Sequence, residues 1–163
     1  MTSPPNPDQR QALELAQTAK ARFETTEAAA EQQGLDLERI AACSQELLDG
    51  IHAGPCQEDV MWVLEICSAM LTAVMAVQGE SLPISSQVDP ASYAMSVLRD
   101  LKTAAEEKGL DFLVLEATAA EGLKKADSEG YSHPETFWAI NRATASVELG
   151  WARALVEGPS DTP

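Results

Sequence analysis

The chain has few basic residues: 11 Lys and Arg stand against 26 Asp and Glu, which gives a formal net charge of −15 over 163 residues. Nucleic acids and anionic lipids are bound through clusters of Lys and Arg that displace counterions, and the sequence contains no such cluster. Direct nucleic-acid binding and membrane binding are therefore not expected. The charge instead favours a partner protein with a basic surface.

Cysteine is also scarce. Cys43, Cys56 and Cys67 form an odd set without paired spacing, which argues against a disulfide framework and for a reducing compartment. Residues 1–10 contain no apolar stretch typical of a secretory signal. The sequence therefore predicts a cytoplasmic protein.

Sequence patterns that bind metals, nucleotides or cofactors are missing. There is no Glu-x-x-His, no Cys-x-x-Cys and no pair of histidines at i and i+4. The glycine-rich phosphate loops and the Gly-x-Ser-x-Gly elbow of hydrolases are missing too. We expect neither a metal nor a cofactor, and an enzyme is the least favoured class of function.

What the chain does contain is a weak internal repeat. The segment Glu31-Gln32-Gln33-Gly34-Leu35-Asp36 returns as Glu106-Glu107-Lys108-Gly109-Leu110-Asp111, an offset of 75 positions (109 − 34). After one inserted residue, Trp62 recurs as Trp138 at an offset of 76 (138 − 62). This pattern predicts a tandem duplication of one helical unit.

Helical periodicity, with few β-branched runs, extends over nearly the whole chain and predicts an all-α protein. The expected helices cover residues 8–33, 36–51, 57–77, 90–108, 111–127 and 132–157. They predict a six-helix bundle of two tandem pseudo-symmetric three-helix repeats, with the third and sixth helices at the centre. The expected organisation is a disordered tail (1–7), repeat 1 (8–79), a linker (80–89), repeat 2 (90–157) and a second tail (158–163), as one compact domain.

Several residues indicate where the helices begin and end. Asp8 is expected to cap the first helix, and Pro90 fits the first turn of the fourth, where its missing N–H costs nothing. In both repeats Gly-Leu-Asp ends one helix and begins the next. Ser132 and Glu135 have the spacing of a capping box at the start of the sixth helix.

The most apolar stretch, residues 60–77, reaches the length of a membrane span. Glu65 interrupts it, basic flanks are missing, and the acidic pair Glu58-Asp59 precedes it. We therefore expect a helix that is buried on most sides inside the protein.

Glu65 is the most unusual carboxylate, because Trp62, Val63, Leu64 and Ile66 flank it. The repeat aligns it with Asn141, and the two could form a buried polar pair with Arg142 as counter-ion. A buried carboxylate with a raised pKa is a candidate acid or base. The simpler interpretation is a structural hydrogen bond or salt bridge that fixes the helix register.

The cysteines have structural interpretations as well. Cys56 aligns with Ser132 at a helix N-terminus, where a thiol pKa can fall, but Glu58 and Asp59 oppose a thiolate. We therefore expect Cys56 to cap its helix rather than to act as a nucleophile. Cys43 and Cys67 lie on apolar faces and are expected in the core.

Tryptophan and methionine gather on the third and sixth helices and predict a soft apolar seam that contacts a ligand or a partner. The residues assigned to this seam, together with the polar residues above, are Trp62, Glu65, Met70, Met75, Trp138, Asn141, Arg142 and Trp151.

Three functions fit these features. The first is an acidic protein-binding or regulatory bundle, as an immunity protein, antitoxin, inhibitor or adaptor would be, which binds a basic protein or a second copy of itself through helices three and six. The second is a bundle that binds a small apolar ligand between the repeats. The third is an enzyme that uses a buried Glu65.

Overall fold

The computed structural model describes residues 7–80 and 89–157, and this part of the chain is all-α with no strand. Six α-helices were predicted and six are found. They are α1 (Pro7–Gln32), α2 (Leu37–His52), α3 (Val60–Val77), α4 (Pro90–Glu107), α5 (Phe112–Ser128) and α6 (His133–Glu157), with a short 3₁₀ segment, η1 (Gln57–Asp59), before α3. The two predicted tails, except Pro7, and most of the predicted linker lie outside the described residues.

The two Gly-Leu-Asp segments have the same local conformation. Gly34 and Gly109 have φ angles of 74° and 76°, a left-handed conformation that glycine adopts without the steric cost of a side chain. Leu35 N–H donates to the Ala30 carbonyl at 2.9 Å and Leu110 N–H to that of Ala105 at 3.0 Å, which closes both helices in the same way.

An aspartate begins the next helix in each case. Asp36 Oδ1 accepts a hydrogen bond from the Glu38 N–H at 2.9 Å, and Asp111 Oδ1 accepts one from the Leu113 N–H at 3.1 Å. Each bond satisfies a backbone donor that has no partner inside its helix. The predicted starts of α2 and α5 are confirmed to within a residue.

The predicted capping box of α6 is also confirmed. The Ser132 N–H donates to Glu135 Oε1 at 2.9 Å, and the Glu135 N–H donates to Ser132 Oγ at 3.2 Å. By contrast, the prediction that Asp8 caps α1 is wrong, because the helix already includes Pro7. Proline is well suited to that first position, since its φ angle is preset for a helix.

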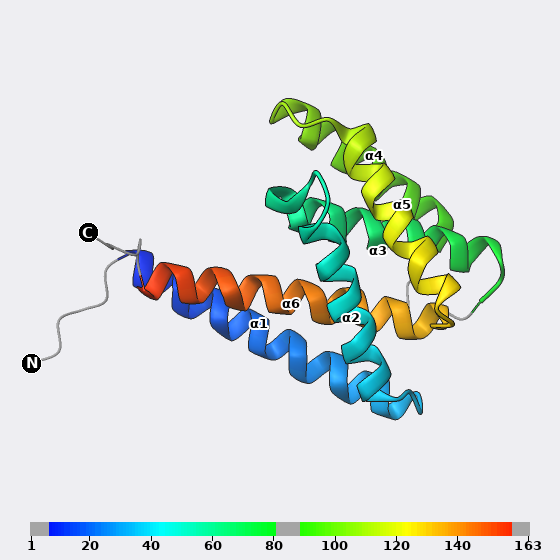
Figure 1. The fold of residues 1–163 in the computed structure, drawn as a ribbon, viewed down its shortest axis with the longest axis horizontal. Helices are drawn as coiled ribbons and strands as arrows, with labels where there is room; N and C mark the ends of the chain where they lie inside the picture. The colour runs from blue at the N-terminus through cyan, green and yellow to red at the C-terminus, as the bar shows by residue number, and fades with distance from the viewer. Residues whose placement is uncertain (1–6, 81–88, 158–163) are drawn as a thin grey trace, which may run out of the picture.

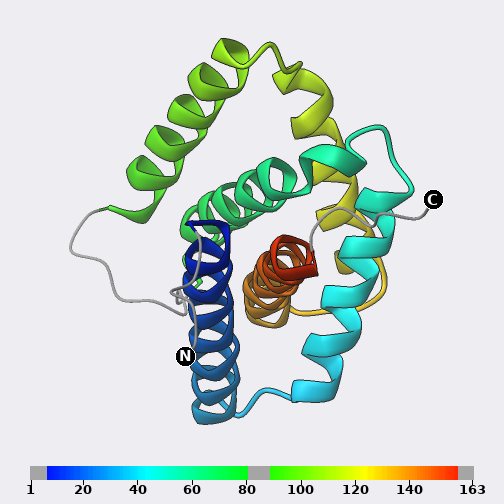
Figure 2. The same ribbon diagram turned by 90° about the vertical axis from the view of Figure 1, so that its left-hand side faces the viewer.

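The most extensive helix contacts are those of α1 with α6 and of α3 with α4, and Figures 1 and 2 show how the helices are arranged. α1 runs antiparallel to α6, and both described ends of the chain lie at one end of this pair; α4 packs along α3. α2 lies across α6, α5 lies against α3, and α3 and α6 contact each other at the centre. The first helix of each half therefore packs on the third helix of the other half.

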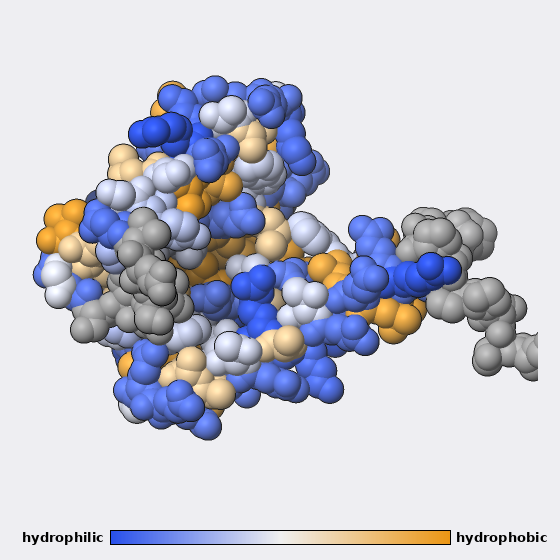
Figure 3. Space-filling view, turned by 180° about the vertical axis from the view of Figure 1, so that it is seen from behind, coloured by the Kyte–Doolittle hydropathy of each residue, from blue (hydrophilic) through white to orange (hydrophobic). Residues whose placement is uncertain are grey.

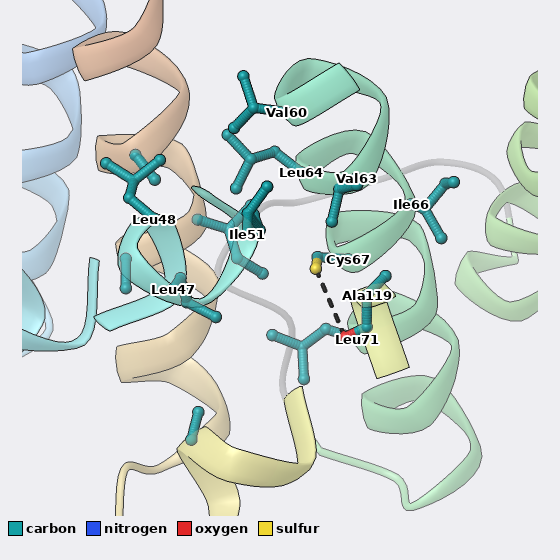
Figure 4. Close-up of a cluster of buried hydrophobic side chains, with 14 of the residues drawn as sticks. Leu47, Leu48, Ile51, Val60, Val63, Leu64, Ile66, Cys67, Leu71 and Ala119 are labelled. Carbon is teal, nitrogen blue, oxygen red and sulfur yellow. Dashed lines mark hydrogen bonds between the residues drawn. The ribbon is translucent and has the colours of Figure 1, made fainter. Parts of the chain in front are cut away.

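The core lies where α2, α3, α5 and α6 meet (Figure 4). Its largest fully buried side chains are Ile40, Val63, Leu64, Ile66, Met75, Leu115, Ile140, Cys43 and Cys67. Cys67 also donates a hydrogen bond from Sγ to the Ala119 carbonyl at 3.7 Å, which joins α3 to α5. Burial of apolar surface on this scale is the main force that stabilises such a bundle.

The segment Gln57–Val77 is the one described segment long and apolar enough to cross a membrane, with a mean hydropathy of 2.0. Half of that window is buried within the fold. Because α3 contacts α4, α5 and α6, its apolar composition is what a central helix of the bundle requires.

Candidate ligand cavity

An open cavity of about 470 Å³ lies between α3, α4 and α6. In the view from behind, hydrophobic residues line a hollow between α4 and the α1/α6 pair (Figure 3). The apolar and aromatic side chains of the lining are Ala69, Tyr93, Ala94, Val97, Phe137 and Trp138. The polar ones are Glu65, Ser68, Thr72 and Asn141.

Two aromatic rings of α6 line the cavity in fixed positions. Phe137 and Trp138 pack edge to face, with ring centroids 5.1 Å apart and planes at 90°, and both residues are buried. Trp138 Nε1 donates to Gln33 Oε1 at 3.2 Å, which holds the indole against the end of α1. These two contacts therefore orient the aromatic wall in the absence of a ligand.

Glu65 was predicted to be buried, and this is wrong: its side chain is exposed. Successive side chains on a helix point about 100° apart, so the apolar residues beside Glu65 in the sequence do not surround it in space. Neighbouring groups still shield the carboxylate partly from water. This desolvation raises the pKa of Glu65, and the positive charge of Arg22 acts in the opposite direction.

The expected polar partners of Glu65 are engaged elsewhere. The Asn141 side-chain amide donates to the Phe137 carbonyl of its own helix at 3.0 Å. Arg142 pairs with Glu27 at 3.2 Å and lies over the Phe23 ring, 5.3 Å from its centroid. The predicted polar pair with Arg142 as counter-ion is therefore wrong, although Glu65 and Asn141 do line the same cavity.

The other residues of the predicted seam do not share one surface. Met75 is fully buried in the core, and Met70 packs against the core from its edge. Trp62 is half-buried, with Lys108 Nζ over its ring at 5.6 Å from the centroid. Trp151 is 46% exposed near the free end of α6. Of the eight seam residues, Glu65, Trp138 and Asn141 are brought together at the cavity.

The α1/α6 pair carries ionic side chains where the α3/α4 pair carries this cavity. Arg22 Nη2 of α1 lies 3.3 Å from Glu148 Oε1 of α6, and Glu148 is buried. The offsets of the sequence repeat align Arg22 with Val97 (97 − 22 = 75) and Glu148 with Thr72 (148 − 72 = 76). Val97 and Thr72, both smaller and uncharged, line the cavity.

A second cavity, of about 310 Å³, lies between α2 and α5. Glu46, Glu121 and Lys125 are at its edge, and Cys43 is part of its wall. A hydrogen bond with the carboxyl group of Glu129 is the main cause that raises the pKa of Glu46. Such a bond between two carboxyl groups requires a proton on one of them, so it favours the protonated form. Sequence reasoning missed this cavity, although Gly50 and Gly122 leave room for it.

The cysteines have structural surroundings. Burial raises the pKa of Cys43 to about 12 and that of Cys67 to about 12, so both remain thiols at neutral pH. Cys56 stands at the N-cap position of η1, but its side chain makes no capping hydrogen bond. Its Sγ instead lies 3.5 Å from Thr118 Oγ1 of α5, so the expected capping role is wrong.

Comparison with protein-family models, curated proteins and solved structures finds no match to this chain. Within residues 7–80 and 89–157, no group of three or more His, Cys, Asp or Glu side chains is placed to hold a metal ion. Tyr93 and Thr72 are lining residues that sequence reasoning missed. For Thr72 and Val97 a signal was available, because the sequence repeat aligns these small residues with Glu148 and Arg22.

Proposed function

We propose that the protein binds a small, mostly apolar molecule in the cavity between α3, α4 and α6. The sequence alone ranks a protein-binding function first and a ligand-binding function second. The geometry favours the second. The observation that carries this proposal is an open cavity of about 470 Å³ walled by aromatic and aliphatic side chains.

The size and chemistry of this cavity are those of a ligand site. Pockets that bind small molecules usually have volumes of roughly 300–1,000 Å³ and apolar walls with a few polar groups that orient the ligand. Here Phe137, Trp138 and Val97 would contact an apolar body, while Glu65 and Ser68 offer polar contacts. The fixed edge-to-face pair supports the proposal, since a preformed wall lowers the ordering cost of binding.

The experiment is to fill the cavity with the residues that the α1/α6 pair carries at the aligned positions. Thr72→Glu with Val97→Arg places an acidic and a basic side chain in the lining. The control, Thr103→Glu with Val114→Arg, makes the same two kinds of substitution at exposed positions of α4 and α5 that do not line the cavity. Tryptophan fluorescence, with Trp138 in the cavity wall, reports binding of octanol, octylammonium and octanoate, and circular dichroism checks that both variants fold.

We expect binding by the wild type and the control and none by the folded cavity variant. If none of the three probes binds the wild type, or if the folded cavity variant binds as well as the wild type does, the proposal is wrong.

The charge favours a second function, association with a partner protein that has a basic surface. A net charge of −15 attracts such partners and speeds their encounter. Native mass spectrometry of the protein purified from its own host, at low and moderate salt, tests this function. A stoichiometric partner lost as salt rises is the expected result, because salt screens exposed charges. A bare chain at both salt concentrations would count against it. We also propose a cytoplasmic location, which the three free cysteines support.

We further propose that the chain is a duplicated pair of three-helix units that exchange their first helices. Matched contacts support this architecture. Gln33, at the end of α1, binds Trp138 of α6, and Lys108, just after α4, lies over Trp62 of α3. The repeat aligns Gln33 with Lys108 and Trp138 with Trp62.

A further inference from the structure

The lining of the α3/α4/α6 cavity contains one ionisable carboxylate and no basic side chain among the described residues. That carboxylate is Glu65, on α3. Its polar companions, Ser68, Thr72 and Asn141, are uncharged. Asn141 and Thr72 both donate to carbonyl groups of their own helices, at 3.0 and 2.8 Å. Glu65 is therefore the lining residue that can form an ion pair with a ligand.

Glu65 forms no ion pair or hydrogen bond within residues 7–80 and 89–157. The positive charge of Arg22 lowers the pKa of Glu65. The guanidinium of Arg22, however, forms its ion pair with the buried Glu148, at 3.3 Å. Partial desolvation raises the pKa of Glu65, because the surrounding groups do not fully replace the water that stabilises the charged carboxylate. A positive group beside it would relieve this cost.

Aromatic side chains lie along the same cavity. Tyr93, Phe137 and Trp138 come from α4 and α6, and the last two are held edge to face. Ring faces attract cations, most strongly when water is partly excluded, and the same rings pack well against hydrocarbon. A carboxylate beside aromatic walls therefore complements a molecule that has a positive end and an apolar body.

From this geometry we infer that the ligand is a hydrophobic ammonium compound, an aliphatic or aromatic amine whose cationic group lies beside Glu65 and whose apolar part contacts Phe137, Trp138 and Val97. This inference rests on the proposed ligand-binding function. The opposite charge is disfavoured, because a ligand carboxylate would repel both Glu65 and the strongly acidic protein as a whole. An uncharged ligand would leave the Glu65 carboxylate without a partner.

The test compares octylammonium, octanol and octanoate, which share a hydrocarbon chain and differ in head-group charge. Dissociation constants are measured by titration calorimetry at constant ionic strength with the wild type, Glu65→Gln and Glu107→Gln. Glu107 is exposed near the end of α4, so its substitution changes the net charge equally but leaves the cavity intact.

We expect the wild type to bind octylammonium most tightly, octanol less tightly and octanoate least. Glu65→Gln should weaken octylammonium binding roughly fivefold, as expected for one partly exposed ion pair together with a contact to an aromatic face. Octanol binding should stay within about twofold, because its contacts are mainly apolar. Glu107→Gln should bind all three compounds as the wild type does.

The results separate this inference from the function on which it rests. If octanol binds as tightly as octylammonium, or if Glu65→Gln leaves octylammonium binding unchanged, the inference is overturned and the ligand-binding function stands. Equal weakening by Glu65→Gln and Glu107→Gln would show a general effect of net charge, which also overturns it. If none of the three compounds binds, both proposals fall together.

Discussion

The α1/α6 and α3/α4 pairs share small side chains where their helices meet but differ in the side chains beside them. In both, buried alanines lie on the facing helices: Ala19 and Ala145 in the first pair, Ala94 and Ala69 in the second. Small side chains at these positions allow the helices to approach closely. The α1/α6 pair then adds the Arg22–Glu148 ion pair, whereas the aligned Val97 and Thr72 of the α3/α4 pair border an open cavity. The aligned positions thus carry an ion pair in the α1/α6 pair and smaller, uncharged side chains beside the cavity in the α3/α4 pair.

The two pairs also differ in length. α1 and α6 have 26 and 25 residues, and α3 and α4 have 18 each. The longer pair extends beyond the rest of the molecule, as Figure 1 shows, and carries exposed apolar side chains at Leu13, Trp151 and Val156. Met75, the residue aligned with Trp151, is fully buried in the core. The halves therefore share a packing plan near the centre and diverge toward the chain ends.

The largest expected effect comes from cutting the molecule between its halves. Fragments 1–80 and 89–163, produced separately, should be largely unfolded, because α1 needs α6 and α4 needs α3 to bury their apolar faces. When mixed, they should form a helical one-to-one complex. Far-ultraviolet circular dichroism and sedimentation measure both outcomes. Cooperative thermal unfolding of either fragment alone would contradict the exchanged packing.

Matched core truncations compare the halves directly. Leu64→Ala in α3 and Ile140→Ala in α6 remove side chains that are 0% and 2% exposed at aligned positions. Each should lower the free energy of unfolding by about 2–5 kcal/mol, the usual cost of an uncollapsed core cavity. Urea unfolding followed by circular dichroism measures this. A cost under about 1 kcal/mol for one of them would mean that its half contributes little to the shared core.

The positions of the helices could be predicted from the sequence because the signals are local. Gly34, Gly109, Asp36 and Asp111 act through hydrogen bonds that span only a few residues. Which helices pair could not be predicted, because the apolar faces of α1 and α4 do not by themselves identify the helix on which each packs. That choice depends on contacts distant in sequence, such as Gln33 with Trp138.

The cavity could be predicted only in part. Trp138, Glu65 and Asn141 follow from the aligned positions on the third and sixth helices, and all three line it. Tyr93 could not be placed there, because its contribution depends on α4 crossing α3. The burial of Glu65 was misjudged because apolar neighbours along a helix point in other directions.

Removing one partner of the Arg22–Glu148 ion pair tests how much this pair contributes to the stability of the protein. Arg22→Val should cost about 3 kcal/mol of stability, because it leaves the buried Glu148 carboxylate without its cation. Arg22→Val with Glu148→Thr, which installs the residues of the cavity side, should cost less than the single change, since no buried charge remains. Urea unfolding of both variants gives the comparison. A double variant less stable than the single one would mean that the pair mainly fills space.

The smallest expected effect concerns the aligned helix starts at Glu135 and Asp59. Burial alone would raise the pKa of Glu135, but hydrogen bonds from Arg39 (2.7 Å) and Ser132, together with the Arg39 charge, outweigh it and hold the pKa below its usual value. A carboxyl group whose pKa is lowered by folding stabilises the protein above its unfolded pKa, and this stability is lost as the pH falls through the folded pKa. Glu135→Gln should therefore cost about 1 kcal/mol at neutral pH and progressively less in acid.

Asp59 makes no side-chain capping hydrogen bond, so Asp59→Asn should change stability little at neutral pH. Urea unfolding of Glu135→Gln at pH 7 and at about pH 3 measures the pH dependence of its effect, since carboxyl groups titrate between these values. If Glu135→Gln costs the same at both pH values, the loss is one of packing rather than of charge. The two helix starts would then differ in shape alone, and the hydrogen bonds of Ser132 and Arg39 to Glu135 would add no pH-dependent stability to α6.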